Sequence, residues 1–345
     1  MSRGVSRASA SLRSRPVSST SPTIPRPRTP ARRSSQVTAF DRFGDRMLRA
    51  LCALGGLIAV AVLADIAYQV ISGARPAISR FGLGFVGHAV WAPNFSHFGA
   101  ATMLYGTAVS SLMGLLIAAP LGIAIAIYLA MLAPRSVRAI VGPLVEMLAA
   151  IPSVVLGFWG VVVLAPFVHK HLEPWLHSTL GFLPIFGPPQ TTGLSIFTAG
   201  LILTVMMLPI IASLSRDLFL TVPRELREGA EALGATRWEV IRGVVLPTTS
   251  SGVAAATVLG LGRALGEAIA VTQVVGDGSA IHASLFLPGT TLASKIANDF
   301  QNTVSNLHVA SLFYLALILL VIGIATSLIA QTISHRFDVS ASLPR

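Results

Sequence analysis

Long apolar stretches dominate this chain of 345 residues and leave it few ways to fold in water. A helix needs about 20 consecutive apolar residues to cross a lipid bilayer, and six stretches are long enough to do so. Only 11% of the residues are charged, against about 25% in soluble domains. The sequence therefore predicts an all-α membrane protein with six transmembrane helices, at about residues 47–71, 100–132, 140–168, 192–215, 249–275 and 309–333.

Basic residues are distributed unevenly among the segments that connect these helices. Under the positive-inside rule, the cytoplasmic segments carry the excess of arginine and lysine. The segments that would lie inside hold most of the arginines, and they are 1–46, 133–139, 216–248 and the C-terminus. The outer segments 72–99, 169–191 and 276–308 hold only Arg75, Arg80, Lys170 and Lys295. We therefore expect both termini to lie in the cytoplasm.

The first forty residues are strongly basic and poor in large apolar side chains. Such a segment cannot bury a core. We expect residues 1–40 to form a disordered cytoplasmic tail that is drawn to anionic lipid headgroups, and residues 41–338 to form the six-span domain. A transit peptide is an alternative for the tail. Nucleic-acid binding is disfavoured, because no aromatic residue stands among the arginines of the tail.

The most charged stretch between two apolar segments is EGAEALGATRWEVIRGVVLP, residues 228–247. Pro223 precedes it and suits the start of a helix, while Gly234 interrupts the helical pattern. Leu246 and Pro247 are expected to end the second arm. The pattern predicts a helical hairpin outside the bilayer, within the inner loop 216–248. An ordinary solvated loop is the alternative.

This loop resembles the coupling motif of ABC importer permeases. The matching positions are Glu228, Gly229, Ala230, Gly234, Val244, Leu246 and Pro247. Gly229 and Val244 depart from the family's usual Ala and Ile, and both keep a small or apolar character. The resemblance implies that the hairpin sits in a groove of a cytoplasmic ATPase and transmits the closure of that ATPase to the membrane helices.

Two membrane segments, AAIPSVVLGFWGVVVLAP (149–166) and LGLGRALGEAIAV (259–271), resemble the PstC family of permeases in phosphate ABC importers. The GFWG and GRALGE runs favour PstC over its companion family PstA. The resemblance covers about residues 40–338 and implies a type I ABC importer permease fold in the bacterial inner membrane. It also implies three partners: a second, PstA-like permease subunit, a PstB-like ATPase dimer and a PstS-like extracytoplasmic phosphate-binding protein. Import of sulfate, molybdate or a phosphonate is an alternative, and so is a secondary transporter.

Four ionisable residues lie within the predicted spans: Asp65, Glu146, Arg263 and Glu267. Charges are costly at the bilayer centre, so each is a functional candidate. Arg263 and Glu267 are four residues apart, which places them on one face of a helix. The glycines around them would let a neighbouring helix approach, so this face is expected to point into the bundle. Arg263 could bind an oxyanion with its planar donor fork, or the two residues could simply neutralise each other.

Several catalytic patterns are missing from the sequence. Neither Lys170 nor Lys295 follows a glycine, so there is no Walker A loop. No nucleophile elbow or HExxH motif is present. We therefore expect a transport subunit without a cofactor that does not hydrolyse ATP itself. His169, His171 and His177 could hold a metal, although an interfacial loop is the more ordinary interpretation and no metal site is predicted.

Overall fold

A computed structural model describes residues 39–336 of the chain, with the side chains of residues 44–333. The predicted tail therefore lies almost wholly outside the described residues, as does the C-terminal end of the predicted domain. The chain divides into two compact units, Met1–Val60 and Ala61–Arg345. The described part of the first unit is the beginning of helix α1 (Ala39–Phe81), whose apolar side chains, such as Leu51 and Leu57, are exposed.

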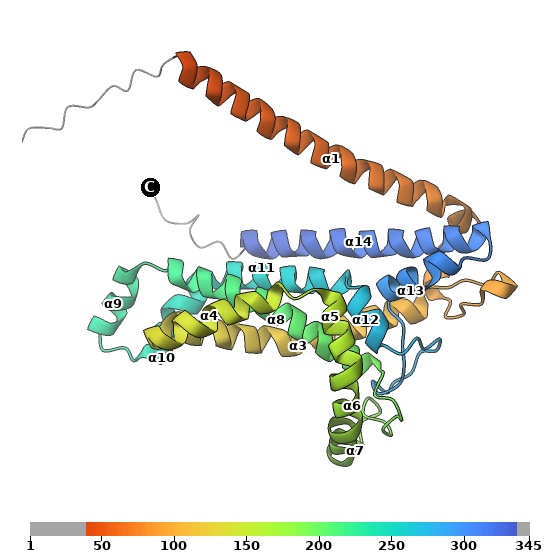
Figure 1. The fold of residues 1–345 in the computed structure, drawn as a ribbon. Coiled ribbons are helices and arrows are strands. Elements are labelled where there is room, and N and C mark those ends of the chain that lie inside the picture. Colours follow the sequence, from red (N-terminus) through yellow and green to blue (C-terminus); the bar gives the residue numbers. More distant parts are fainter. Residues whose placement is uncertain (1–38, 337–345) are drawn as a thin grey trace, which may run out of the picture. The chain divides into compact units, whose positions relative to one another are not determined.

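Every regular element in the described part of the second unit is a helix (Figure 1). After α1 come α2 (Gly84–Gly87), α3 (Ala101–Ile127) and α4 (Arg135–Ala149). Short π-helical turns then join α5 (Ser153–Trp159), α6 (Ala165–Phe167) and α7 (Glu173–Leu180) into one helical arm. The remaining helices are α8 (Ile196–Thr221), α9 (Arg224–Ala232), α10 (Arg237–Val240), α11 (Leu246–Leu265), α12 (Ile269–Val274), α13 (Leu292–Asp299) and α14 (Asn306–Arg336).

Helix α8 is the centre of this unit and packs along α3 (Figure 1). Small residues allow the two backbones to approach closely. A Cβ atom added at Gly200 would lie 2.2 Å from the methyl carbon of Met113, and one at Gly114 would lie 3.1 Å from the carbonyl oxygen of Gly200. The hydroxyl of Thr204 donates to the same carbonyl at 2.9 Å, so no buried donor is left unpaired there. Such small-residue packing is typical of membrane helices.

A second cluster joins the end of α1 to α14. Ala74 and Ala77 are fully buried in this cluster. The Phe85 and Tyr314 rings stack with centroids 4.4 Å apart, and the Tyr314 hydroxyl donates to the carbonyl oxygen of Gly82 at 3.0 Å. The C-terminal part of α1 therefore shares an apolar cluster with α14, and the turn that follows α1 is joined to α14 by a hydrogen bond.

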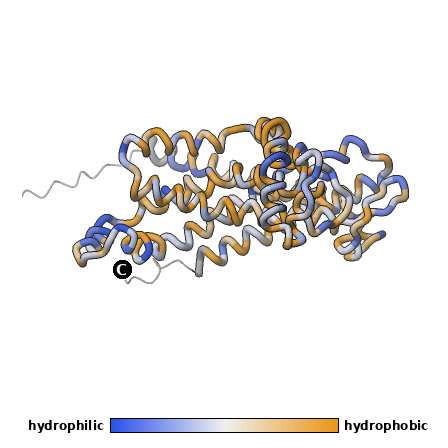
Figure 2. Tube along the Cα trace, turned by 90° about the horizontal axis from the view of Figure 1, so that it is seen from below, coloured by the Kyte–Doolittle hydropathy of each residue, from blue (hydrophilic) through white to orange (hydrophobic). Residues whose placement is uncertain are grey.

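Within residues 39–336, six helices are long and apolar enough to cross a membrane, which confirms the predicted number. Figure 2 shows apolar residues along these helices and hydrophilic residues concentrated at their ends and connections. The second apolar helix covers Ala101–Leu132, close to the predicted 100–132. The fourth, Ile196–Thr221, begins and ends later than the predicted 192–215.

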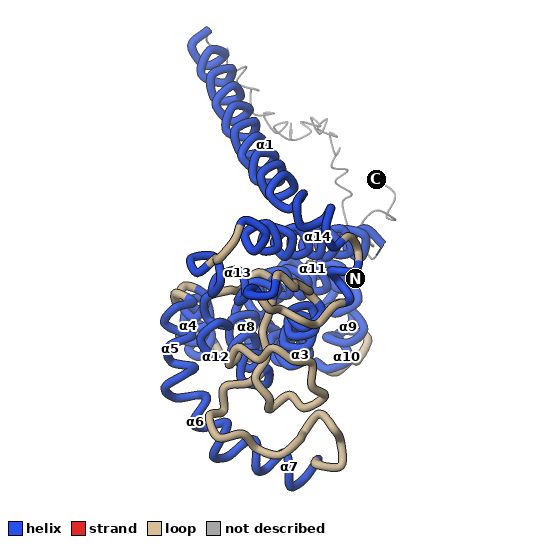
Figure 3. Tube along the Cα trace, turned by 90° about the vertical axis from the view of Figure 1, so that its right-hand side faces the viewer, coloured by secondary structure: helices blue, strands red, loops and turns tan. Residues whose placement is uncertain are grey.

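The third predicted span, 140–168, is not one straight helix. Helix α4 packs beside α8 and ends at Ala149. The helical conformation is interrupted at Ala150–Pro152, and the arm α5–α7 then runs in a different direction from the bundle (Figures 1 and 3). The cause is the Ile151-Pro152 step, because proline disfavours the helical conformation of the residue before it. The apolar helix continues to Leu180, so the predicted outer loop 169–191 actually begins after α7.

The arm is joined to α12 through two glycines. A Cβ atom at Gly157 would lie 2.8 Å from the Cα atom of Ala270, and one at Gly160 would lie 2.7 Å from Cγ1 of Val274. These are the glycines of the GFWG run, with Trp159 between them, half exposed. The run therefore creates a crossing at which α5 touches the backbone of α12.

Candidate functional site

The segment 223–241 forms the predicted helix–turn–helix. Pro223 precedes α9 with extended backbone (φ −53°, ψ 139°). Gly234 adopts a φ of +90°, a left-handed conformation that glycine reaches without the strain of a side chain. Its N–H donates to the carbonyl oxygen of Glu231 at 2.9 Å. A capping box then starts α10, in which the N–H of Thr236 donates to Oε2 of Glu239 at 2.7 Å.

The residues of the coupling-type motif divide between two faces of this hairpin. Ala230, Val244 and Leu246 pack against a core cluster that includes Phe219 at the end of α8. The remaining four are exposed: Glu228, Gly229, Gly234 and Pro247. The first group attaches the hairpin to the bundle, and the second leaves a surface open for a partner.

Three large apolar side chains are exposed on the hairpin, although it is the most charged stretch between two apolar segments. Leu233 is 91% exposed, Trp238 62% and Leu226 51%. Exposed apolar groups gathered at one place mark interaction sites, and tryptophan is enriched among the side chains that dominate binding energy. Sequence reasoning missed these residues. An apolar side chain next to the turn glycine was the signal that could have found them.

The expected helix end at Leu246–Pro247 is wrong. The helix continues from Arg237 to Leu265 through a π-helical turn at Ile241–Val245. A proline inside an α-helix lacks the N–H donor and crowds the preceding turn. Because Pro247 lies in the first turn of α11, two residues after the wider π turn ends, the helix accommodates it. The second arm of the hairpin is therefore continuous with the membrane helix α11.

Arg263 does not lie on a buried face of α11. The inward face carries Gly260 and Ala264, and a Cβ atom at Gly260 would lie 3.1 Å from Ile211 of α8. Arg263 itself is exposed, and the neighbouring Gly262 has no atom within 4 Å of an added Cβ. The expectation that the Arg263 face points into this chain's own bundle is therefore wrong, because only one of the three nearby glycines packs inward.

Arg263 and Glu267 are also not on one helix. Helix α11 ends at Leu265, and Gly266 follows as its cap. Glu267 lies in the break before α12, and its Oε1 accepts a hydrogen bond from the N–H of Ala270 at 3.2 Å. Among the residues whose side chains are described, no ion pair joins Arg263 and Glu267. The helical spacing was misleading because glycine weakens the helix there.

The other two charged residues of the spans have polar partners. Arg216 Nη1 on α8 lies 2.9 Å from Oε1 of Glu146 on α4. Asp65 accepts a hydrogen bond from Nε2 of Gln69 at 2.7 Å on the same helix. Glu146 therefore joins two helices, whereas Asp65 is paired locally.

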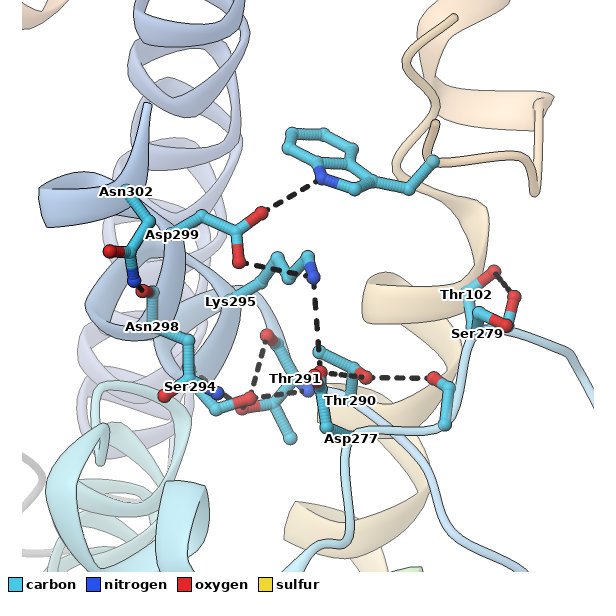
Figure 4. A network of polar contacts seen from close by, with 12 residues as sticks. Thr102, Asp277, Ser279, Thr290, Thr291, Ser294, Lys295, Asn298, Asp299 and Asn302 are labelled. Carbon is cyan, nitrogen blue, oxygen red and sulfur yellow. Dashed lines mark hydrogen bonds and ion pairs between the residues drawn. The ribbon is translucent and has the colours of Figure 1, made fainter. Parts of the chain in front are cut away.

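A polar network ties several segments together at the end of the bundle opposite the hairpin (Figures 1 and 4). Lys295 Nζ on α13 lies 3.1 Å from Oδ1 of Asp299 and 3.8 Å from Oδ1 of Asp277. The other oxygen of Asp299 accepts from Nε1 of Trp91 at 2.9 Å and lies 3.3 Å from Nε2 of His308. Sequence reasoning used Lys295 to assign topology and to exclude a Walker A loop, and it missed this network.

The histidines of the third apolar segment lie in helical turns, not in the expected interfacial loop. His169 Nδ1 lies 4.0 Å from Oε2 of the fully buried Glu173, and the same oxygen accepts from the N–H of Gln190 at 3.0 Å. Over residues 39–336, no three His, Cys, Asp or Glu side chains gather in a way that could hold a metal ion.

Residues 122–339 match the family of binding-protein-dependent transport system inner membrane components. This chain belongs to that family. It is 41% identical over 316 residues to the phosphate transport system permease protein PstC of Mesorhizobium japonicum, covering 90% of this chain and 96% of the relative. It is 42% identical over 282 residues to the PstC of Pasteurella multocida, covering 80% and 87%. Within the wider family, the chain thus belongs with the PstC permeases and is a multi-pass membrane transport component.

A solved bacterial alginate ABC transporter, in complex with an alginate pentasaccharide-bound periplasmic protein, has a chain of similar fold. The TM-score is 0.58, with 17% identity, over 88% of this chain and 99% of that chain. At this identity the likeness concerns the fold alone. Together with the family match, it confirms the predicted type I ABC importer permease fold.

Proposed function

We propose that this chain is the membrane-spanning permease subunit of an ATP-driven phosphate importer. The observation that carries this proposal is the identity of 41% to a PstC permease over 96% of that relative. So long an alignment includes the membrane helices as well as the hairpin, and therefore the parts that would contact the transported ion.

The partners follow from the same assignment. A second permease subunit would complete the pathway, an ATPase dimer would supply the energy, and an extracytoplasmic phosphate-binding protein would deliver the ion. The hairpin would bind the ATPase, because Leu233 and Trp238 are exposed there on both sides of the Gly234 turn. Glu228, Gly229 and Pro247 lie on the exposed side as well.

This assignment implies an orientation in which the hairpin and both termini are cytoplasmic. A cysteine introduced at Thr236 should react with an impermeant thiol reagent only from the inside, and one at Ser178 or Ser284 only from the outside. Replacing Cys52 by Ser removes the single native thiol first. Labelling of the Thr236 position from outside would reverse the orientation and remove the ATPase role of the hairpin.

The transport pathway would include Arg263, with Glu267 at the break below it. Arg263 is exposed in this chain, which suits a residue that faces a second permease subunit across a pathway. A guanidinium is always charged and donates two parallel hydrogen bonds, which matches a phosphate ion. Glu267 would act by capping α12 and so fixing the end of α11, since its carboxylate is held by Ala270.

The decisive experiment is to purify the chain with its natural partners in proteoliposomes. ATP hydrolysis and uptake are then measured with phosphate-loaded and sulfate-loaded binding proteins on the outside. Stimulation of both activities by phosphate alone is the expected result. Stimulation by sulfate, or uptake without ATP, would contradict the proposal.

A further inference from the structure

An arginine-lined pocket lies between the hairpin and the hairpin-side end of the second apolar helix, within the second unit. Its volume is about 340 Å³. Arg224 and Arg227 of α9 and Arg237 of α10 line it, together with Glu228, Glu231 and the thioether of Met131. The pocket thus brings both arms of the hairpin against the end of a membrane helix.

The charged side chains that line this pocket, three arginines and two glutamates, form no ion pairs with the described residues of the chain. Arg227 donates only to the sulfur of Met131 at 3.5 Å, and its Nε is buried without an acceptor. Thioether sulfur is a weak acceptor. A guanidinium nitrogen that is buried without an acceptor favours a stronger one nearby.

We propose that this pocket binds a phosphate group at the cytoplasmic surface of the membrane, a role that rests on the proposed orientation of the chain. Guanidinium forks match phosphate oxygens in geometry, and basic pockets beside membrane helices on the cytoplasmic side bind anionic headgroups. The group comes either from an anionic lipid or from free phosphate. Glu228 and Glu231 leave only a small excess of positive charge, so the site takes a single phosphate group and weakens with salt.

Occupancy would change the mechanics of the hairpin. A phosphate group held by Arg224 and Arg227 on one arm and Arg237 on the other would join both arms to each other. Because Met131 belongs to the second apolar helix, the group would also fix the hairpin against that helix. The orientation in which the hairpin binds the ATPase would then depend on whether the phosphate group is bound.

The test uses the purified full chain and measures hydrogen exchange of the amides in 224–241. One arm adds inorganic phosphate to the protein in detergent, and the other compares nanodiscs of phosphatidylcholine with nanodiscs that also contain phosphatidylglycerol. We expect slower exchange in at least one arm. Arg227→Gln should weaken binding by about tenfold or more, as for a lost charged hydrogen bond. Arg227→Lys should weaken it less, and Arg242→Gln, an equal charge change outside the pocket, should leave it unchanged.

The outcomes separate the sources. Slower exchange with free phosphate assigns the site to the cytoplasmic ion, and slower exchange only with phosphatidylglycerol assigns it to a lipid. No protection in either arm, or equal protection in Arg227→Gln, overturns the proposal. Protection that needs the added ATPase would assign the arginines to a protein interface and also overturn it. The exchange pattern without ligand shows whether each variant folds, and none of these measurements depends on transport.

Discussion

Arg216 of α8 and Glu146 of α4 form an ion pair of 2.9 Å across 70 residues of sequence. Glu146 lies near the end of α4, just before the break at Ala150–Pro152, and Arg216 lies near the end of α8, just before the hairpin. The pair therefore joins the ends of these two helices. Gly142 on the same helix makes room for it, because an added Cβ would lie 3.2 Å from Nη1 of Arg216.

Replacing Glu146 by Gln should lower the free energy of unfolding by about 1.5 kcal/mol. We take the lower end of the range for hydrogen bonds to charged groups, because 57% of the Glu146 side chain is exposed and solvent weakens the pair. Unfolding of the purified chain in detergent measures the loss. The exchange of both residues, Glu146→Arg with Arg216→Glu, should recover most of it. Asp217→Asn, a charge change at the next position of α8, is the control; an equal loss in the control would deny the pair any special role.

Replacing Gly234 by Asp should uncouple ATP hydrolysis from transport while the membrane helices still fold. An added Cβ would have no atom of the described residues within 4 Å, so the variant would not clash with them. Asn tolerates the same left-handed backbone without a charge and serves as the control. ATPase binding and phosphate uptake in proteoliposomes are the measurements. Normal uptake by Gly234→Asp would exclude a tight fit of this turn in the ATPase.

Trp238→Ala should weaken binding of the ATPase by about 30-fold, equivalent to ~2 kcal/mol for a dominant interface side chain. The stability of the chain alone should hardly change, since Trp238 is 62% exposed. Leu83→Ala is a suitable control, because Leu83 is 87% exposed at the opposite end of the bundle. Titration of the detergent-solubilised chain with the ATPase tests this. Equal binding by wild type and Trp238→Ala would remove the exposed tryptophan from the docking surface.

Arg263→Gln should abolish phosphate transport and leave assembly intact. Glu267 is held by the N–H of Ala270, so removing the arginine leaves no carboxylate without a partner. Arg263→Lys keeps the charge but loses the planar fork and should retain part of the activity. Glu267→Gln should instead cost about 1 kcal/mol of stability, as a weakened helix cap does. Assembly of the complex by size exclusion and uptake of phosphate distinguish the two effects. Poor assembly of Arg263→Gln would argue for a structural role.

Lys295→Met should destabilise the chain by about 3 kcal/mol, because it removes the cation that lies 3.1 Å from the largely buried carboxylate of Asp299 and 3.8 Å from Asp277. The Lys295 side chain is only 14% exposed. Adding Asp299→Asn should recover part of the loss. Lys170→Met, at an exposed position, should have little effect, and thermal unfolding of the four proteins checks the series. An equally large loss of stability in Lys170→Met would mean that the lower net positive charge, and not the loss of the Lys295 contacts, destabilises the chain.

Hydropathy was sufficient to predict the number of spans, because the segments that connect the spans contain no apolar run long enough to cross a bilayer. It could not locate the break before Pro152, since Ile151 and Val154 are as apolar as the helices around them. The turn at Gly234 was predictable because glycine and the capping residues Thr236 and Glu239 are local signals. The surroundings of Arg263 and Glu267 were not, because a helix end beside Gly266 changes which residues share a face.

Partners distant in sequence were also beyond prediction. No local sequence signal near Glu146 predicts its contact with Arg216, and none near Lys295 predicts its proximity to Trp91. These contacts depend on the packing of α4 on α8 and of α13 on the loop before α3. The sequence singled out Glu267 as a charge within a predicted span, but it could not show that the partner of this carboxylate is a backbone N–H three residues ahead.

The glycine crossing of α5 over α12 has a mechanical consequence. No side chain separates Gly157 from the backbone of Ala270, and Ala270 is the residue whose N–H holds Glu267. A tilt of the arm therefore cannot be absorbed by side-chain rotation at this crossing and must displace the first turn of α12. The arm and the break that holds Glu267 are therefore mechanically coupled, and a partner that pushes on the arm would also change the geometry of the proposed pathway beside Arg263.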